Sequence, residues 1–338
     1  MGPDGEVTKV SSQAQVVIVP SESAVLPTAP SFPQPERILP IGLLLGLLIG
    51  YAIAAVRHRN DTKVRRVEDV EEITESGVLG ILPESTDLGS ETGDATRAKP
   101  FHEREALRKL RTNLRFVDVD HQPRTIVVTS SKQGEGKSTV ASNLATVLAE
   151  SGEKVVLIDA DMRRSAVARA FDLDGSVGLS QVLAGDVDIQ DALQPTPAPG
   201  LDVLAAGAVP PNPTELLGSH RMERLMNELS RDHYVILDAP PLLPVTDAAL
   251  LSRVADGAVL VVAAGKTHRE ELERSVQSLK SVDGKILGAI LNMVSTRAVD
   301  RLRYGDVAYG YSNVYESEYL PTEETTSRRE LRASRRRR

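Results

Sequence analysis

The sequence predicts an α/β fold, in which a mostly parallel sheet is flanked by helices and preceded by one transmembrane helix. Two observations predict the sheet: residues 125–128, 155–158 and 234–237 are continuous apolar runs, and each run leads into a polar loop. Runs of this kind are typical of parallel strands that are buried on both faces. A third observation predicts the membrane helix, because residues 38–56 carry no formal charge.

The apolar segment 38–56 has the length of a membrane span. A helix over these residues rises about 28 Å at about 1.5 Å per residue, and the hydrocarbon core of a bilayer is about 30 Å thick. Only Lys9 and Arg37 precede the segment, whereas five basic residues follow it at once: Arg57, Arg59, Lys63, Arg65 and Arg66. The positive-inside rule therefore predicts a single-pass protein of the cell membrane, with the N-terminus outside and the remaining domain in the cytoplasm.

Three glycines, Gly42, Gly46 and Gly50, recur every four residues in this segment. The spacing permits close pairing of two membrane helices. Glycine is also tolerated generally in membrane helices, so both interpretations stay open.

The rest of the chain is expected to form four segments. Residues 1–37 are rich in proline and are predicted to be an extracytoplasmic segment without regular structure. Residues 57–100 are predicted to be a juxtamembrane segment and a linker. Residues 101–299 are predicted to hold the α/β domain, starting with a helix over residues 103–116, and residues 300–338 a disordered tail.

A Gly-rich loop, TSSKQGEGKST at residues 129–139, joins the first strand to a helical segment at residues 140–148. Gly134 and Gly136 have no Cβ, so backbone N–H groups can surround phosphate oxygens. Lys137 can reach the β- and γ-phosphates, and the hydroxyl of Ser138 can bind Mg²⁺. The pattern predicts a P-loop NTPase whose ATP-binding residues are Gly134, Glu135, Gly136, Lys137, Ser138 and Thr139.

Aspartates follow the other two predicted strands. Asp159 and Asp161 come after the second strand, and Asp238 comes after the third. Because the carboxyl ends of parallel strands meet at one edge of a sheet, we expect these carboxylates to lie beside Lys137 and to be catalytic with it. Ser138, Asp161 and Asp238 are the candidate Mg²⁺ ligands. The alternative is that the aspartates only cap the helices that follow.

The motifs TSS..GEGKST, LIDADMRR and ILDAPP occur in this order. In them the chain resembles the bacterial tyrosine kinases (BY-kinases) of capsule and exopolysaccharide biosynthesis, which are related to partition and septum-site ATPases. Segments 178–180, 210–217 and 243–247 are also similar to this family. Residues 67–73 and 78–83 resemble the juxtamembrane helix and strand of a chain-length determinant (polysaccharide co-polymerase), and residues 1–37 resemble the end of its extracytoplasmic domain.

The resemblance implies a protein-tyrosine kinase that uses ATP and Mg²⁺. One of Asp159 and Asp161 is expected to accept the tyrosine proton, and Asp238 is expected to act on Mg²⁺. Asn292 matches the position that contacts adenine in related ATPases, although an asparagine at the end of a strand is often a turn residue.

The chain also departs from the family's pattern. Gln133 stands where the family often has proline, and Ala239 stands where it often has threonine or serine. Lys132 occupies the position of the second lysine of partition-type ATPases, which reaches the partner's nucleotide. The favoured interpretation of Lys132 is a solvated loop lysine.

Five of the seven tyrosines fall within sixteen residues of the tail: Tyr304, Tyr309, Tyr311, Tyr315 and Tyr319. Their neighbours are mostly small, polar or acidic, so this segment is not expected to build a core. The resemblance implies that these tyrosines are autophosphorylation sites. The alternative is that they pack into a surface groove.

The resemblance also implies partners. A homo-oligomer is expected, most simply a ring, in which subunits meet through Glu105, Arg108 and Arg111 on one helix face; a solvated surface is the alternative. The other expected partners are the membrane, the machinery of polysaccharide polymerisation and export, and a phosphotyrosine phosphatase. The folded extracytoplasmic domain of the co-polymerases does not occur in this sequence, so either the N-terminus is truncated or a separate chain-length determinant subunit carries that domain.

Composition narrows the function classes. The chain has no cysteine, which excludes disulfides, thiol catalysis and Cys-based zinc sites. A formal net charge of −7 argues against nucleic acid as a partner. The resulting hypothesis is an autokinase that phosphorylates its own tail and regulates polysaccharide polymerisation or export. Two alternatives stay open, a partition- or septum-type switch ATPase without kinase activity and a non-kinase chain-length scaffold.

Overall fold

The computed structural model describes residues 35–59, 61–84, 101–118 and 121–295. The chain divides into two compact units, residues 1–61 and residues 62–338. Residues 1–34 of the predicted Pro-rich segment, residues 85–100 of the linker and the whole predicted tail with its five tyrosines lie outside the described residues.

The first unit contains one helix, α1 (Pro35–Arg59), among its described residues. Within α1, residues Ile38–Val56 are long and apolar enough to cross a membrane by length and composition. The predicted helix is therefore confirmed as an element, and it is consistent with a membrane anchor. Its orientation across a membrane stays a prediction.

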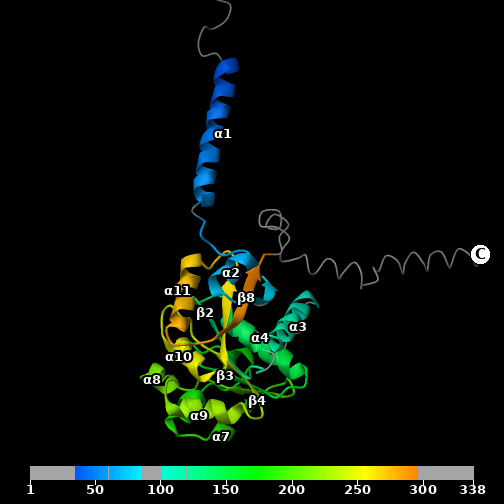
Figure 1. The fold of residues 1–338 in the computed structure, drawn as a ribbon, viewed down its shortest axis with the longest axis vertical. Helices are drawn as coiled ribbons and strands as arrows, with labels where there is room; N and C mark the ends of the chain where they lie inside the picture. The colour runs from blue at the N-terminus through cyan, green and yellow to red at the C-terminus, as the bar shows by residue number, and fades with distance from the viewer. Residues whose placement is uncertain (1–34, 60, 85–100, 119–120, 296–338) are drawn as a thin grey trace, which may run out of the picture. The chain divides into compact units, whose positions relative to one another are not determined.

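The second unit is built on an eight-stranded sheet with the strand order β1-β8-β7-β2-β6-β3-β5-β4 (Figure 1). All neighbouring strands are parallel except β4 and β5, which are antiparallel. This arrangement confirms the predicted fold class. The strands are β1 (Val78–Pro83), β2 (Thr125–Ser130), β3 (Val155–Asp159), β4 (Leu193–Pro195), β5 (Leu201–Leu204), β6 (Tyr234–Asp238), β7 (Gly257–Ala263) and β8 (Ile286–Val294).

Helices cover both faces of the sheet, and each face has its own hydrophobic core. One core is closed by α3 (Phe101–Arg115), α4 (Lys137–Glu150) and α5 (Val167–Ala170). The other is closed by α2 (Val67–Thr74), α6 (Leu179–Ala184), α7 (Ile189–Ala192), α8 (Pro213–Leu217), α9 (His220–Leu229), α10 (Asp247–Val254) and α11 (Arg269–Lys280). In Figure 1, α3 and α4 lie on one side of the sheet and α10 and α11 on the other.

The central strands are apolar throughout because both of their faces are covered. In β2, Val127 belongs to one core, whereas Ile126 and Val128 belong to the other. Successive side chains of a strand point to opposite faces, so a strand between two helix layers needs an apolar residue at every position. This is the physical basis of the uninterrupted apolar runs in the sequence.

The juxtamembrane residues are part of this second unit. Strand β1 pairs with β8 at the sheet edge, and its Leu79 and Leu82 are buried. Asn113 of α3 donates its amide to the carbonyl of Leu79 at 2.9 Å. The sequence predicts a juxtamembrane segment here and a domain that starts at residue 101, whereas the compact unit starts at Thr62. The difference arises because β1 and α2 bury their apolar residues against the domain.

Candidate functional site

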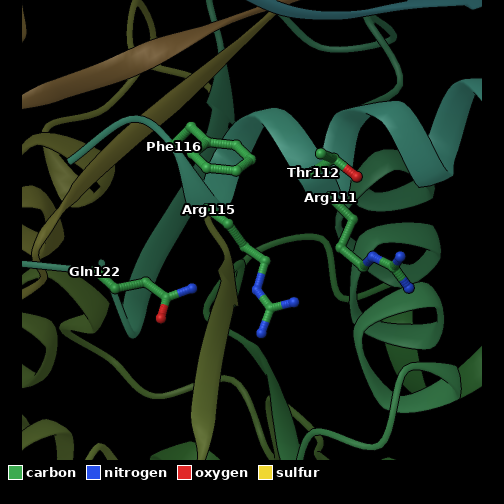
Figure 2. Close-up of a pocket in the computed structure, with 5 residues that line it drawn as sticks. All are labelled: Arg111, Thr112, Arg115, Phe116 and Gln122. Atoms are coloured by element: carbon green, nitrogen blue, oxygen red, sulfur yellow. The ribbon is translucent and has the colours of Figure 1, made fainter. Parts of the chain in front are cut away.

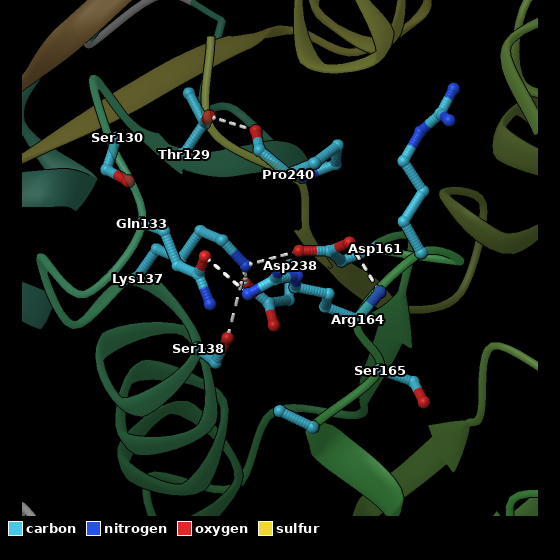
Figure 3. A network of polar contacts seen from close by, with 12 residues as sticks. Thr129, Ser130, Gln133, Lys137, Ser138, Asp161, Arg164, Ser165, Asp238 and Pro240 are labelled. Carbon is cyan, nitrogen blue, oxygen red and sulfur yellow. Dashed lines mark hydrogen bonds and ion pairs between the residues drawn. The ribbon is translucent and has the colours of Figure 1, made fainter. Parts of the chain in front are cut away.

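The strand register brings the predicted catalytic residues to one edge of the sheet. Strand β6 lies between β2 and β3, so Asp238 is level with Val128 on one side and with Asp159 on the other. The phosphate loop follows β2, and Lys137 is the first residue of α4. Figure 3 shows Lys137, Ser138, Asp161 and Asp238 pointing toward one another at this edge.

Lys137 is buried and is surrounded by carboxylates. Its Nζ atom lies 2.9 Å from Asp161 Oδ2 and 3.6 Å from Asp238 Oδ1, and it donates to the Ser138 hydroxyl at 3.3 Å. Burial by itself lowers the pKa of Lys137, but the attraction of Asp238, Asp161 and Asp159 outweighs it and holds the pKa above its ordinary value. The lysine is therefore a charged group, positioned where phosphates would bind.

Asp159 is fully buried, and backbone groups hold its carboxylate. Asp159 Oδ1 accepts the N–H of Asp161 at 3.2 Å, and Oδ2 accepts the N–H groups of Ala166 and Val167, each at 3.0 Å. Burial and the nearby charge of Asp238 raise the pKa of Asp159 to about 7. Asp159 therefore shapes the loop that carries Asp161, in addition to any chemical role.

Asp238 is buried without hydrogen-bond partners. Among the residues that the structure describes, neither carboxylate oxygen makes a hydrogen bond, and Lys137 Nζ lies 3.6 Å from Oδ1. Burial raises the pKa of Asp238, against the attraction of Lys137. Lys137 compensates part of this buried charge, and the carboxylate oxygens without hydrogen bonds can accept a further cation. Mg²⁺ in phosphate sites needs only one or two carboxylates besides phosphate and water. Asp238 and the nearby Ser138 hydroxyl therefore fit the Mg²⁺ that the sequence predicts, although the described part of the chain holds no cluster of three acidic or histidine ligands.

The phosphate loop has the backbone that its glycines predict. Gly134 and Gly136 have φ angles of 83° and 90°, in the left-handed region that other residues rarely adopt. A Cβ on Gly136 would also collide with the side-chain amide of Asn292. Both positions thus require glycine for the loop to curl around an anion.

Asn292 supports the phosphate loop through a hydrogen bond to its backbone. It is buried at the end part of β8, and its Nδ2 donates to the carbonyl of Glu135 at 2.9 Å. The sequence analysis suggested an adenine contact for this residue. That role stays a prediction, and the structure adds a support role that sequence reasoning missed.

Glu135 is buried in the same loop. It accepts the N–H of Lys132 at 2.9 Å and a short hydrogen bond from the hydroxyl of Thr267, which lies in the loop after β7. Burial raises the pKa of this carboxyl, against those hydrogen bonds. Thr267 also accepts the N–H of Ala263 at 3.0 Å, so it ties the phosphate loop to β7.

The loop after β7 connects to the juxtamembrane residues as well. Val64 donates its N–H to the carbonyl of Thr267 at 2.9 Å, and Gly265 donates to the carbonyl of Val64 at 2.8 Å. Val64, in the juxtamembrane segment, is therefore hydrogen-bonded directly to Thr267, which in turn contacts Glu135 of the phosphate loop. Thr267 had no signal in the sequence, because a threonine in a loop is common.

Gln133 and Lys132, the two unusual loop residues, both have partners in the same chain. Gln133 accepts a hydrogen bond from Arg164 Nη1 at 2.6 Å, and the backbone N–H of Arg164 donates to Asp161 Oδ1 at 3.0 Å (Figure 3). Lys132 Nζ pairs with Glu271 Oε1 at 2.9 Å, although about half of the lysine side chain is exposed. The interpretation of Lys132 as a loop lysine stays a prediction.

The predicted subunit-contact residues lie on α3, away from this site. Glu105 and Arg108 form an exposed pair, with Oε2 and Nη1 3.6 Å apart. Arg111 lines an open pocket together with Thr112, Arg115, Phe116 and Gln122 (Figure 2). Phe116 is 69% exposed, so this surface combines basic side chains with an uncovered aromatic ring. The composition suits a protein contact, and the assignment itself stays a prediction.

Known proteins resemble this chain over residues that include the site described above. A family model described as "ParA: NUBPL iron-transfer P-loop NTPase" matches residues 121–304. Tyrosine-protein kinase YwqD of Bacillus subtilis is 46% identical over 189 residues, which cover 56% of this chain and 80% of that protein. Tyrosine-protein kinase etk of Escherichia coli is 35% identical over 322 residues, which cover 88% of this chain but only 44% of that protein.

Solved structures of similar proteins share the fold. The BceF tyrosine kinase domain is 34% identical, with a TM-score of 0.62, over 69% of this chain and 99% of that domain. The chimerical protein CapA2B2 is 32% identical, with a TM-score of 0.63, over 68% of this chain and the whole of that protein. The residues of the second unit therefore have their relatives among tyrosine kinase domains.

Proposed function

Because the chain belongs to the bacterial tyrosine-protein kinases, we propose that it transfers the γ-phosphoryl group of ATP to tyrosines of its own C-terminal tail and thereby regulates polysaccharide polymerisation or export. The observation that carries this proposal is the buried group of Lys137, Asp161 and Asp238 at the end of β2, β3 and β6. It stands beside a phosphate loop, as phosphoryl transfer requires.

Each residue of the group has a role in the proposed transfer. Asp161 accepts the proton of the tyrosine hydroxyl, because Lys137 is the one described residue that contacts its Oδ2, and ATP would draw this lysine toward its phosphates. The phenolic oxygen then bonds to the γ-phosphorus while the bond from that phosphorus to the bridging oxygen breaks, which leaves ADP. Lys137 neutralises charge on the transferred group, and Asp159 keeps the Asp161 loop in place.

Mg²⁺ would be held by Asp238 and Ser138, with Asp161 as the further candidate. When bound, it would supply positive charge to the β- and γ-phosphate oxygens. The carboxylate of Asp238, which makes no hydrogen bond among the described residues, supports this assignment. Adenine is proposed to lie near Asn292, whose amide borders the phosphate loop.

The proposed substrate is the tyrosine cluster Tyr304, Tyr309, Tyr311, Tyr315 and Tyr319. The cluster begins soon after β8, whose last residue is Val294, so it is tethered to the same domain as the site. Each phosphate would add a charge of about −1.5 to −2. Full phosphorylation would therefore repel neighbouring tails and weaken an oligomer of this chain.

The proposed setting is the cell membrane. Helix α1 would anchor the chain, with the N-terminus outside and residues from 57 onward in the cytoplasm, where ATP is available. A separate membrane subunit of the chain-length determinant type is a proposed partner, and the two-part name of the similar CapA2B2 chimera is compatible with such a pairing. A phosphotyrosine phosphatase would reverse the modification.

The second candidate function is a switch ATPase of the partition type, favoured by the match to the ParA family model. Such a protein would hydrolyse ATP and phosphorylate nothing. The description of that family model also names iron transfer. This chain has no cysteine that could ligate an iron–sulfur cluster.

One experiment separates the two candidates. The full chain in lipid nanodiscs receives ATP and Mg²⁺, and anti-phosphotyrosine signal and phosphate release are measured together. The kinase proposal expects ATP-dependent phosphotyrosine that disappears when all five tail tyrosines become phenylalanine, with ATP binding unchanged. Phosphate release without phosphotyrosine would instead establish the switch ATPase.

A further inference from the structure

Several parts of the sequence have no role in the transfer described above, and three of them meet in the fold. They are Arg163, which follows the catalytic aspartates, and the segments 210–217 and 243–247. The fold brings one side chain from each part together: Arg163, Thr214 of α8 and Asp247 at the first residue of α10. These positions are far apart in the sequence, so only the folded chain makes the cluster.

The three side chains form a closed cycle of hydrogen bonds. Arg163 Nε donates to Asp247 Oδ2 at 3.2 Å, and Arg163 Nη2 donates to the Thr214 hydroxyl at 3.1 Å. The Thr214 hydroxyl in turn donates to Asp247 Oδ1 at 2.5 Å. Each member therefore orients the other two, and the planar guanidinium fixes the direction of both of its bonds.

The burial of the cluster is uneven. The side chain of Asp247 is 1% exposed, whereas that of Arg163 is 42% exposed. Asp247 is thus anchored in the packed layer of α8 and α10, and the more exposed Arg163 reaches it from the loop that carries Asp161. A partly exposed guanidinium adds little to the stability of the core. Packing alone therefore does not explain why Arg163 pairs with Asp247.

We propose that Arg163 is a positioning residue that holds Asp161 at its working distance from the phosphate site. Arg163 follows Asp161 by two residues, so the two Cα atoms are at most about 7 Å apart at 3.3–3.6 Å per residue. Fixing Arg163 on α8 and α10 therefore restrains the loop that carries Asp161. This inference rests on the proposed kinase function and assigns a role to segments 210–217 and 243–247.

A simpler role for Arg163 would be to neutralise the buried charge of Asp247. Removing the arginine alone would leave that carboxylate buried with one hydroxyl donor, which destabilises a protein. The variant Arg163→Ala therefore cannot separate the two roles. The double variant Arg163→Ala with Asp247→Asn can, because it removes the arm and the stranded charge together.

The experiment uses the full chain in nanodiscs and measures thermal unfolding, KM for ATP, and kcat for phosphotyrosine formation and for phosphate release. The proposal expects Arg163→Ala to lose stability and about 10-fold to 100-fold in kcat, since displacements of about 1 Å near a reacting group have costs of this size. KM for ATP should not change. The double variant should regain the stability of the wild-type chain and keep the low kcat.

Two further variants calibrate the result. Arg163→Lys should recover part of kcat, because lysine can pair with Asp247 but does not reproduce the two-armed contact with Thr214. Arg169→Ala is the matched control, because its guanidinium contacts only the Ser165 carbonyl, at 3.4 Å, among the contacts of described residues, and this variant should keep the wild-type kcat.

Recovery of both stability and kcat in the double variant would overturn the proposal, and so would a wild-type kcat in Arg163→Ala. A failure of the kinase function gives a different result: the wild-type chain would then release phosphate without forming phosphotyrosine. In that case the same variants are expected to lower the rate of phosphate release.

Discussion

At the scale of residues, the site depends on how burial and charge act on Lys137 and on three carboxylates, those of Asp159, Asp161 and Asp238. Lys137 lies among three carboxylates, and their attraction exceeds the cost of burying its charge. Asp159 and Asp238 face each other on adjacent strands, so burial and mutual repulsion favour a proton on one of them. The site without nucleotide is therefore a compact set of partly compensated charges.

The first prediction concerns Lys137. Lys137→Met should abolish phosphotyrosine formation, because groups that stabilise charge on the transferring phosphoryl are worth on the order of 10³–10⁵ in rate. Autophosphorylation of the full chain, followed by anti-phosphotyrosine signal with time, is the measurement. Circular dichroism should show an intact fold. Labelling at the wild-type rate would remove Lys137 from the mechanism.

The second prediction concerns pH and Asp159. The pKa of Asp159 is raised to about 7 in the folded chain from 3.8, so the folded state binds the proton more tightly than the unfolded state. Stability should therefore fall as pH rises from about 4 to 7, and this contribution should be constant above that range. Asp159→Asn cannot ionise and should lose this decline.

The measurement is the unfolding temperature of the full chain and of Asp159→Asn at several pH values between 5 and 8. The difference between variant and wild type should move in favour of the variant as pH rises. A constant difference over this range would show that Asp159 does not titrate there.

At the scale of elements, the phosphate loop is held by parts of the chain that sequence distance separates widely. Asn292 of β8 binds the Glu135 carbonyl, and Thr267 after β7 binds the Glu135 side chain. The same threonine receives the N–H of Val64 on its carbonyl. Changes in the juxtamembrane segment therefore have a short path to the nucleotide site.

The third prediction tests this connection. Thr267→Val keeps the shape of the side chain but removes the hydroxyl from Glu135 and from the N–H of Ala263. Leaving buried polar groups unpaired should lower the free energy of unfolding by about 1–3 kcal/mol and raise KM for ATP. Thr267→Ser keeps the hydroxyl and is the control. Equal values for both variants would mean that the hydrogen bonds are not needed.

The fourth prediction concerns α1. Its apolar residues Ile38–Val56 and the basic residues after it predict a single crossing with the N-terminus outside. Protease added to intact spheroplasts should remove an N-terminal tag and spare a C-terminal tag. The reverse pattern would place the ATP site outside the cell and would contradict the proposed function.

At the scale of the whole molecule, the question is whether one subunit phosphorylates itself or its neighbour. The chain from Val299 to Tyr319 can extend at most about 65–70 Å at 3.3–3.6 Å per residue, so reach permits either route. The surface formed by the exposed Arg108 and the half-buried Arg111 of α3, with the exposed Phe116 just after this helix, favours a contact with a second copy. Exposed ion pairs are weak singly, at about 0–1 kcal/mol, but a ring repeats them and membrane anchoring raises the local concentration.

The fifth prediction is therefore transfer between subunits. A Lys137→Met chain with an intact tail is mixed with an active chain that ends at Arg303, and label is measured on the first chain. Label should appear there, and it should be lost when Arg108 and Arg111 become alanine. An unlabelled Lys137→Met chain would show that transfer occurs within one subunit.

Much of this protein could be predicted from the sequence alone. The apolar runs at β2, β3 and β6, the loop with Gly134 and Gly136, and the aspartates after the strands all follow local rules of period, turn chemistry and strand ends. Strand β7 has the same kind of apolar run, Gly257–Ala263, but no phosphate-loop glycine or strand-end aspartate follows it to mark it as part of the site. The strands predicted from the sequence were thus those whose apolar run is followed by a recognisable site motif.

Only the tertiary structure decided which distant residues meet. Glu135 and Thr267 are 132 positions apart, and Arg163 and Asp247 are 84 positions apart, so no local period connects them. The same holds for β1, which the resemblance to the co-polymerases predicts as a juxtamembrane strand and which pairs with β8 in the sheet. Local patterns record how a residue relates to its neighbours along the chain, whereas pairs like these depend on strand order and helix packing, which bring the two residues together only after the chain has folded.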